Sequence, residues 1–247
     1  ASGPGDKPAS TSEPPALEQI QNRLAQLQAD TSLTAANKQN LVTLYEAIIT
    51  ELKARADHDK QTKELYAKAA AAPTATLELK NRQENPPARD LVSANALRSY
   101  QLPALQSLLQ AQQSLLQTAA DGRAKTEAEI KAREASKKEL PRLIAEDRAA
   151  LKKLQEKLVA VPGAEPVDQV LREAESQLLK AQLAAMAEKI KKNEQALRTI
   201  EAEAELLPLR KAMFIADERY YGGRVKEIND ELYKRRETII QGEQDKA

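Results

Sequence analysis

The sequence predicts an all-α protein: an elongated antiparallel coiled coil or helical bundle in which two long helices form a hairpin and shorter helices precede them. An apolar register of alternating three- and four-residue steps runs from Leu179 to Ile239, which is the repeat of helices that wind around a partner. Charged residues make up 30% and aromatic residues 3% of the chain, a composition typical of long helices. The clearest reversal signal, Val161 to Pro166, lies between two long helical stretches.

Residues 1–15 are predicted to form a flexible tether, and residues 16–247 a single elongated domain. The tether is rich in proline and serine and has no apolar periodicity. A first helix is expected to begin after Pro15 and to end near Asp30. Its apolar face consists of Leu17, Ile20, Leu24 and Leu27. Thr34 is predicted to cap the next helix, because a threonine hydroxyl can accept a hydrogen bond from a free amide of the first turn.

The second helix is expected to end at Ala69–Ala72, because Pro73 follows. Proline lacks an N–H group and its ring clashes with the carbonyl four residues earlier. A short helical piece is predicted from about Thr76, and the pair Pro86 and Pro87 is predicted to form a corner. The apolar face of the second helix consists of Leu41, Leu44, Ile48, Leu52 and Leu65.

A long helix is predicted to run without interruption from Ser93, its N-cap, to about Ala160. Its apolar seam is poor between Gln117 and Lys138, where we expect a solvated helix supported by ion pairs between residues four apart. These expected pairs are Glu127–Lys131, Glu129–Arg133 and Glu134–Lys138. Pro141 should kink the helix, because it removes one internal hydrogen bond.

The last helix is predicted to run antiparallel to the previous one, from near Val167 to about Gln241. Its heptad register survives Pro208 and the pair Gly222 and Gly223, so we interpret these positions as bends or points of close helix approach. Candidate hinge or register positions are therefore Pro141, Asn193, Pro208, Gly222 and Gly223.

Asn193 occupies a seam position, where a buried amide can fix helix register at a cost in stability. Replacement of Asn193 by leucine should raise thermal stability, because a buried unpaired amide costs about 1–3 kcal/mol. A second notable cluster lies beside the glycine pair and consists of Met213, Phe214, Tyr220 and Tyr221. Local packing explains this cluster most simply, and a hinge or an oligomer contact is the alternative.

No pattern of residues indicates catalysis, a cofactor or a metal. His58 is the single histidine, and the residues that share its helix face are poor ligands, so we interpret it as part of a solvated charged face. The absence of cysteine excludes thiolate sites. Carboxylate clusters such as Glu201, Glu203 and Glu205 need a pocket to separate their pKa values, and the thin seams offer few pockets.

The charge balance gives no support to nucleic-acid binding. The 38 basic and 37 acidic residues leave a net charge of +1, and the basic clusters lie beside acids without aromatic stacking platforms. These clusters are Lys191–Lys192, Arg210–Lys211 and Lys234–Arg236. We interpret them as solvated surface.

Four stretches of the chain share a pattern of leucine and alanine: Leu33 to Leu52, the Ala71–Ala72–Pro73 break with Leu77 and Leu79, Gln177 to Leu197, and Leu207 to Leu232. In these stretches the chain resembles a known family, the periplasmic α-helical "porin" domain of KefA-type large mechanosensitive channels of the MscS superfamily. The glycine pair and Pro141, which lacks a preceding arginine, depart from the family pattern.

The resemblance implies a non-catalytic periplasmic module, attached to the inner membrane in the full-length protein, that contributes to assembly and modulates gating. Its implied partners are the channel membrane domain of the same polypeptide and the other subunits of the homo-oligomer, with periplasmic or membrane surfaces as further contacts. The alternative is a free-standing coiled-coil scaffold or a protein that binds membrane surfaces. Transmembrane helices encoded downstream would distinguish the two.

Overall fold

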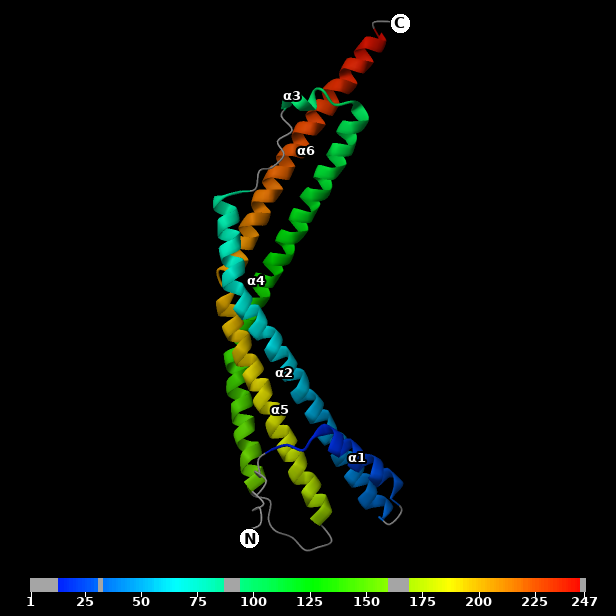
Figure 1. Ribbon diagram of the computed structural model, residues 1–247, viewed down its shortest axis with the longest axis vertical. Coiled ribbons are helices and arrows are strands. Elements are labelled where there is room, and N and C mark those ends of the chain that lie inside the picture. The colour runs from blue at the N-terminus through cyan, green and yellow to red at the C-terminus, as the bar shows by residue number, and fades with distance from the viewer. Residues whose placement is uncertain (1–12, 31–32, 87–93, 160–168, 245–247) are drawn as a thin grey trace, which may run out of the picture. The chain divides into compact units, whose positions relative to one another are not determined.

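The structure is a computed structural model that describes residues 13–30, 33–86, 94–159 and 169–244 (Figure 1). Over these ranges the chain is all-α, as predicted. The helices in chain order are α1 (Leu17–Ala29), α2 (Ala35–Glu84), α3 (Ala94–Leu97), α4 (Leu102–Val159), α5 (Gln169–Ala202) and α6 (Leu206–Gln244).

The chain divides into two compact units. Unit 1 consists of Ala1–Lys68 and Lys137–Thr199, and unit 2 of Ala69–Ser136 and Ile200–Ala247. The long helices α2 and α4 therefore contribute residues to both units, and each unit has its own apolar cluster.

In unit 1, α1, the first part of α2 and α5 share one apolar core. Its buried members are Ile20, Leu27, Leu41, Tyr45, Ile48, Leu52, Ala174 and Ala181. The turn between α1 and α2 is held by Lys38, whose Nζ donates to the carbonyl oxygens of Gln28 and Asp30 at 2.8 and 2.7 Å. These carbonyls belong to the last turn of α1 and its C-cap, where the helix itself supplies no donor.

Helices α2 and α5 lie side by side and run in the same direction in unit 1 (Figure 1). The Thr199 hydroxyl lies 3.1 Å from the carbonyl oxygen of Leu65, which fixes their register. The last part of α4 runs antiparallel to α5, as expected for the predicted pair. The reversal predicted at 161–166 lies outside the described residues.

Helix α5 buries two faces where the sequence predicts one. Ile190 and Asn193 belong to the predicted seam, and both are buried. A second column consists of small or polar residues that are also buried: Ala174, Ala181, Ala185, Gln195 and Thr199. This column was missed because alanine and threonine do not register as an apolar stripe, although small side chains let helices approach closely.

In unit 2, the first part of α4 packs antiparallel against α6. The apolar cluster lies near the start of α4 and joins it to α3 and α6 through Leu97, Leu105, Ile228 and Leu232. Further along the pair, Ala119 and Thr126 of α4 are buried.

The predicted end of the second helix is wrong, because α2 continues through Pro73 to Glu84. Only one intrahelical donor is lost at a proline. Around it lie good helix formers, and Ala72 and Thr76 are both buried, so tertiary packing compensates for the lost bond.

Two helices predicted to be continuous are broken, and in both cases a proline lies just after the break. Helix α4 begins only at Leu102, so that Pro103 falls in its first turn, where no intrahelical donor is needed. Helix α5 ends at Ala202, and Pro208 is the third residue of α6. Between them the N–H of Ala204 bonds to the carbonyl of Glu201, three residues back, at 3.2 Å.

Helix caps follow the predicted chemistry where the structure describes them. The Thr34 hydroxyl accepts from the N–H of Asn37 at 3.4 Å, which confirms the predicted cap of α2. The predicted cap at Ser93 lies outside the described residues.

Candidate functional site

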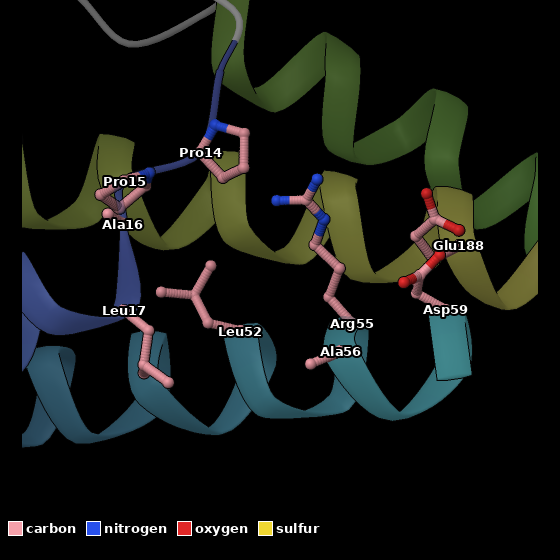
Figure 2. Close-up of a pocket in the computed structure, with 9 residues that line it drawn as sticks. All are labelled: Pro14, Pro15, Ala16, Leu17, Leu52, Arg55, Ala56, Asp59 and Glu188. Atoms are coloured by element: carbon pink, nitrogen blue, oxygen red, sulfur yellow. The ribbon is translucent and has the colours of Figure 1, made fainter. Parts of the chain in front are cut away.

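The groove in Figure 2 lies in unit 1, between the start of α1, α2 and α5, and has a volume of about 450 Å3. Its polar residues are Arg55, Asp59 and Glu188. Lys63 donates to Asp59 at 2.6 Å and holds the pKa of that carboxyl below its ordinary value. General acid catalysis needs a carboxyl whose pKa is raised, so Asp59 is unsuited to that role.

A group of polar side chains joins α4 to α5 elsewhere in unit 1. Asp147 of α4 is its centre and is only 7% exposed. Nζ of Lys189 donates to Oδ1 of Asp147 at 2.7 Å, and Nδ2 of Asn193 donates to Oδ2 at 3.4 Å. The buried carboxylate thus receives one donor on each oxygen, which compensates for much of its loss of water.

Asn193 is buried in the predicted seam, but it is not unpaired. Its amide is 6% exposed and its partner is a buried carboxylate oxygen. The premise that the Asn193 amide is unpaired is therefore wrong, and we now expect Asn193→Leu to lower stability, because the substitution removes one donor from Asp147.

His58 is half-buried rather than part of a solvated face. Its ring lines a groove of about 250 Å3 with Glu51, Gln182 and Lys189, and its Nδ1 is shielded from solvent without a hydrogen-bond partner. Burial lowers the pKa of His58 below its ordinary value, and Lys192 and then Lys189 lower the pKa further. The sequence alone could not show this, because the burial comes from α5.

In unit 2, a series of ion pairs connects α4 to α6 and to the turn before it. The pairs are Arg123–Glu218 at 3.0 Å, Glu127–Lys211 at 3.0 Å, Glu129–Arg210 at 3.6 Å and Arg133–Glu203. The first of these lacks hydrogen-bond geometry despite its short distance. Glu127, Glu129 and Arg133, which were predicted to pair within their helix, instead pair across to the neighbouring segment.

Helix α4 lies very close to a side chain of α6 at Gly122. A Cβ atom added there would lie less than 3.0 Å from Cδ1, Cε1 and Cζ of the Phe214 ring. Phe214, the single phenylalanine of the chain, therefore packs over a glycine. Phe214 stands out in the sequence as part of an aromatic cluster, whereas Gly122 does not, because a lone glycine within a charged stretch carries no periodic signal.

The predicted close approach at the glycine pair is absent. An added Cβ at Gly222 meets only Cδ1 of Leu116, at 4.0 Å, and one at Gly223 meets nothing within 4 Å. Helix α6 runs through both residues, and α4 runs through Pro141. Of the five candidate positions, Asn193 and Pro141 belong to unit 1, and Pro208, Gly222 and Gly223 belong to unit 2.

Each of the three basic clusters has at least one member that makes a polar contact within the protein. Arg210 and Lys211 pair with acids of α4, and Lys191 lies 3.5 Å from Glu188. Arg235 pairs with Glu231 and donates to the carbonyl oxygens of Leu97, Arg98 and Tyr100. Arg235 therefore satisfies the carbonyls at the end of α3, a role that the sequence analysis missed because α3 itself was not predicted.

The described ranges contain no group of three or more His, Cys, Asp or Glu residues placed to hold a metal ion. Over the same part of the chain, each helix falls short of the length of uninterrupted apolar sequence that a bilayer crossing requires.

These observations define the class of protein: an all-α module in which ion pairs and hydrogen bonds between charged side chains connect neighbouring helices. The family model "Mechanosensitive ion channel porin domain" matches residues 16–244. The chain belongs to this family, as the resemblance implied, and so to a family of channel proteins. No curated protein and no solved structure matches it significantly.

Proposed function

We propose that this chain is a non-catalytic periplasmic module of an MscS-type mechanosensitive channel, and that it contributes to channel assembly and modulates gating. The match of the channel family to residues 16–244 carries the proposal. In this role residues 1–15 serve as a tether and residues 16–247 act as one module. Its partners are the membrane domain of the same polypeptide and the other subunits of a homo-oligomer.

The ion pairs between neighbouring helices support a mechanical role. Four basic side chains form ion pairs with carboxylates of a neighbouring segment in the same unit. They are Arg123, Arg133, Lys189 and Lys211. Such pairs tie helices together and specify which side chains face one another. A module with these contacts can transmit force through its helices, which a gating role requires.

We propose that Pro141, Pro208, Gly222 and Gly223 are positions where helices bend under load, and that Asn193 fixes register. Each glycine costs α6 about 1 kcal/mol relative to alanine. Neither glycine is required for close packing, since an added Cβ meets no atom nearer than 4.0 Å. Local flexibility of the helix therefore remains as their physical contribution.

The gating role can be tested with the Gly222→Ala/Gly223→Ala double variant of the full-length channel. The substitutions should stiffen α6 and shift the membrane tension needed to open the pore in patch-clamp recordings. Gly242→Ala is the matched control, because it lies in the same helix and also has nothing within 4 Å. An unchanged threshold in the double variant would contradict the proposed hinge.

The proposed compartment can be tested separately, because this part of the chain contains no cysteine. Tyr233 is 70% exposed, so Tyr233→Cys offers an accessible thiol. In the full-length protein, a membrane-impermeant maleimide should label this variant in cells whose outer membrane alone is permeabilised. Labelling only after the inner membrane is broken would refute the periplasmic placement.

A further inference from the structure

The register of α2 on α5 brings the chain's single histidine opposite a lysine. Leu65 and Thr199 are in contact, and the two helices run in the same direction. His58 and Lys192 each lie seven residues, or about two turns, before this contact on their own helix. Glu51 and Ala185 lie seven residues earlier again, and both line the groove that contains the His58 ring. His58 and Lys192 therefore face each other across the α2–α5 seam.

Two lysines and three carboxylates lie around His58. Lys192 and Lys189 of α5 lower the pKa of the imidazole, and Asp147 of α4 raises it. On α2 itself, Asp57 and Glu51 lie nearby. Asp147 already accepts from Lys189 and Asn193. In the part of the chain that the structure describes, Lys192 has no carboxylate within ion-pair distance.

Protonation of His58 is costly in this position for a second reason. Its Nδ1 is shielded from solvent and has no hydrogen-bond partner. When the imidazole is charged, both ring nitrogens carry a hydrogen and need acceptors. An N–H at Nδ1 would therefore remain unsatisfied unless the helices move apart and admit water.

We propose that the facing pair His58 and Lys192 makes the α2–α5 seam of unit 1 sensitive to pH. Mild acid protonates His58, places a second cation across the seam from Lys192, and loosens the packing of α2 on α5. This inference concerns the packing of unit 1 and does not depend on the channel role proposed above.

The direction of the effect follows from the lowered pKa of His58 in the folded protein. In the unfolded chain the imidazole takes up a proton near its ordinary pKa of about 6.5. As the pH falls below that value, the unfolded state binds the proton first and the folded state loses stability. The contribution of His58 to stability is thus full above the unfolded pKa and is lost as the pH falls to the folded pKa.

The first test is an NMR titration of the imidazole, which a single histidine makes unambiguous. The wild-type chain should titrate below 6.5, and Lys192→Gln should move the pKa of His58 upward. Lys191→Gln is the matched control, because Lys191 is exposed and lies beside Glu188. A wild-type pKa at or above 6.5, or an unchanged pKa in Lys192→Gln, would overturn the proposal.

The second test compares thermal unfolding of the wild type and His58→Gln between pH 8 and pH 5. The midpoint Tm of the wild type should fall further than that of His58→Gln, since glutamine cannot take up a proton here. For a chain of this size, each tenfold change in the unfolding equilibrium constant moves Tm by about 3–6 °C. Parallel pH profiles would overturn the proposal, and the NMR titration decides it even if His58→Gln fails to fold.

The loosening itself can be located by hydrogen exchange, corrected for the intrinsic effect of pH on exchange rate. Amides of α2 around Thr62 and Leu65 should lose protection in the wild type at pH 5 but keep it in His58→Gln. Equal protection of both proteins at pH 5 would show that the seam stays closed and would refute the structural part of the proposal.

Discussion

The contact between Gly122 and Phe214 predicts that one glycine of this chain cannot be replaced by alanine without cost. The added methyl group would lie less than 3.0 Å from three carbon atoms of the Phe214 ring, so the ring has to move. Overpacking of this kind costs about 1–3 kcal/mol. The alanine also gains up to about 1 kcal/mol of helix propensity, which offsets part of the loss.

We therefore expect Gly122→Ala to lower the free energy of unfolding by about 1–2 kcal/mol. In a protein of this size, this corresponds to a fall in Tm of roughly 2–8 °C. Gly223→Ala makes the same chemical change in a helix but meets no atom within 4 Å. It should instead raise the free energy of unfolding by up to about 1 kcal/mol.

The assay is thermal and urea unfolding of both variants, followed by circular dichroism. Phe214→Leu provides a second control, because in that background the clash is reduced and Gly122→Ala should lose most of its cost. The resulting coupling energy should lie in the range of about 0.5–3 kcal/mol found for residues in contact. If Gly122→Ala were as stable as Gly223→Ala, the close approach of α4 to α6 would be refuted.

Three further outcomes follow from the charged contacts. Asn193→Leu should lower the free energy of unfolding by about 1–2 kcal/mol in urea titrations, because Asp147 loses a donor; a gain in stability would contradict the assigned hydrogen bond. Glu203 is 8% exposed and pairs with Arg133. Glu203→Gln should therefore lower the free energy of unfolding by about 1–2 kcal/mol at low salt and by less in about 1 M NaCl. A loss of stability that does not depend on salt would exclude a mainly electrostatic role. Arg235→Lys should lower the free energy of unfolding by about 1–2 kcal/mol and increase hydrogen exchange near α3. Arg236 is exposed, so Arg236→Lys should change neither quantity. Equal effects of the two substitutions would refute the capping role of Arg235.

The fold class was predictable from the sequence because it depends on periodicity and composition, which are local properties. Thr34 was recognised as a cap for the same reason, since an N-cap acts within one turn. Prolines were harder to interpret. Pro73 and Pro103 have the same local chemistry, yet a helix runs through the first and begins just before the second. What differs is the packing around them, which the sequence does not display.

The charged contacts could be predicted only in part. The acids and bases of α4 were recognised, but their partners were assigned within the helix, where spacing is known in advance. The observed partners Glu203, Arg210 and Lys211 lie far along the chain. The burial of His58 and the contact of Gly122 likewise depend on which segment packs opposite. Such facts require the register between helices, and no periodicity within one helix supplies it.

The proposed role of this chain in modulating a mechanosensitive channel can be tested by deleting residues 16–244 from the full-length protein. Patch-clamp recordings in excised membrane patches would give the tension threshold of the deleted channel and of the wild type at equal expression. We expect that the deleted channel still conducts but opens at a different tension. An identical threshold and identical opening kinetics in the two proteins would contradict it.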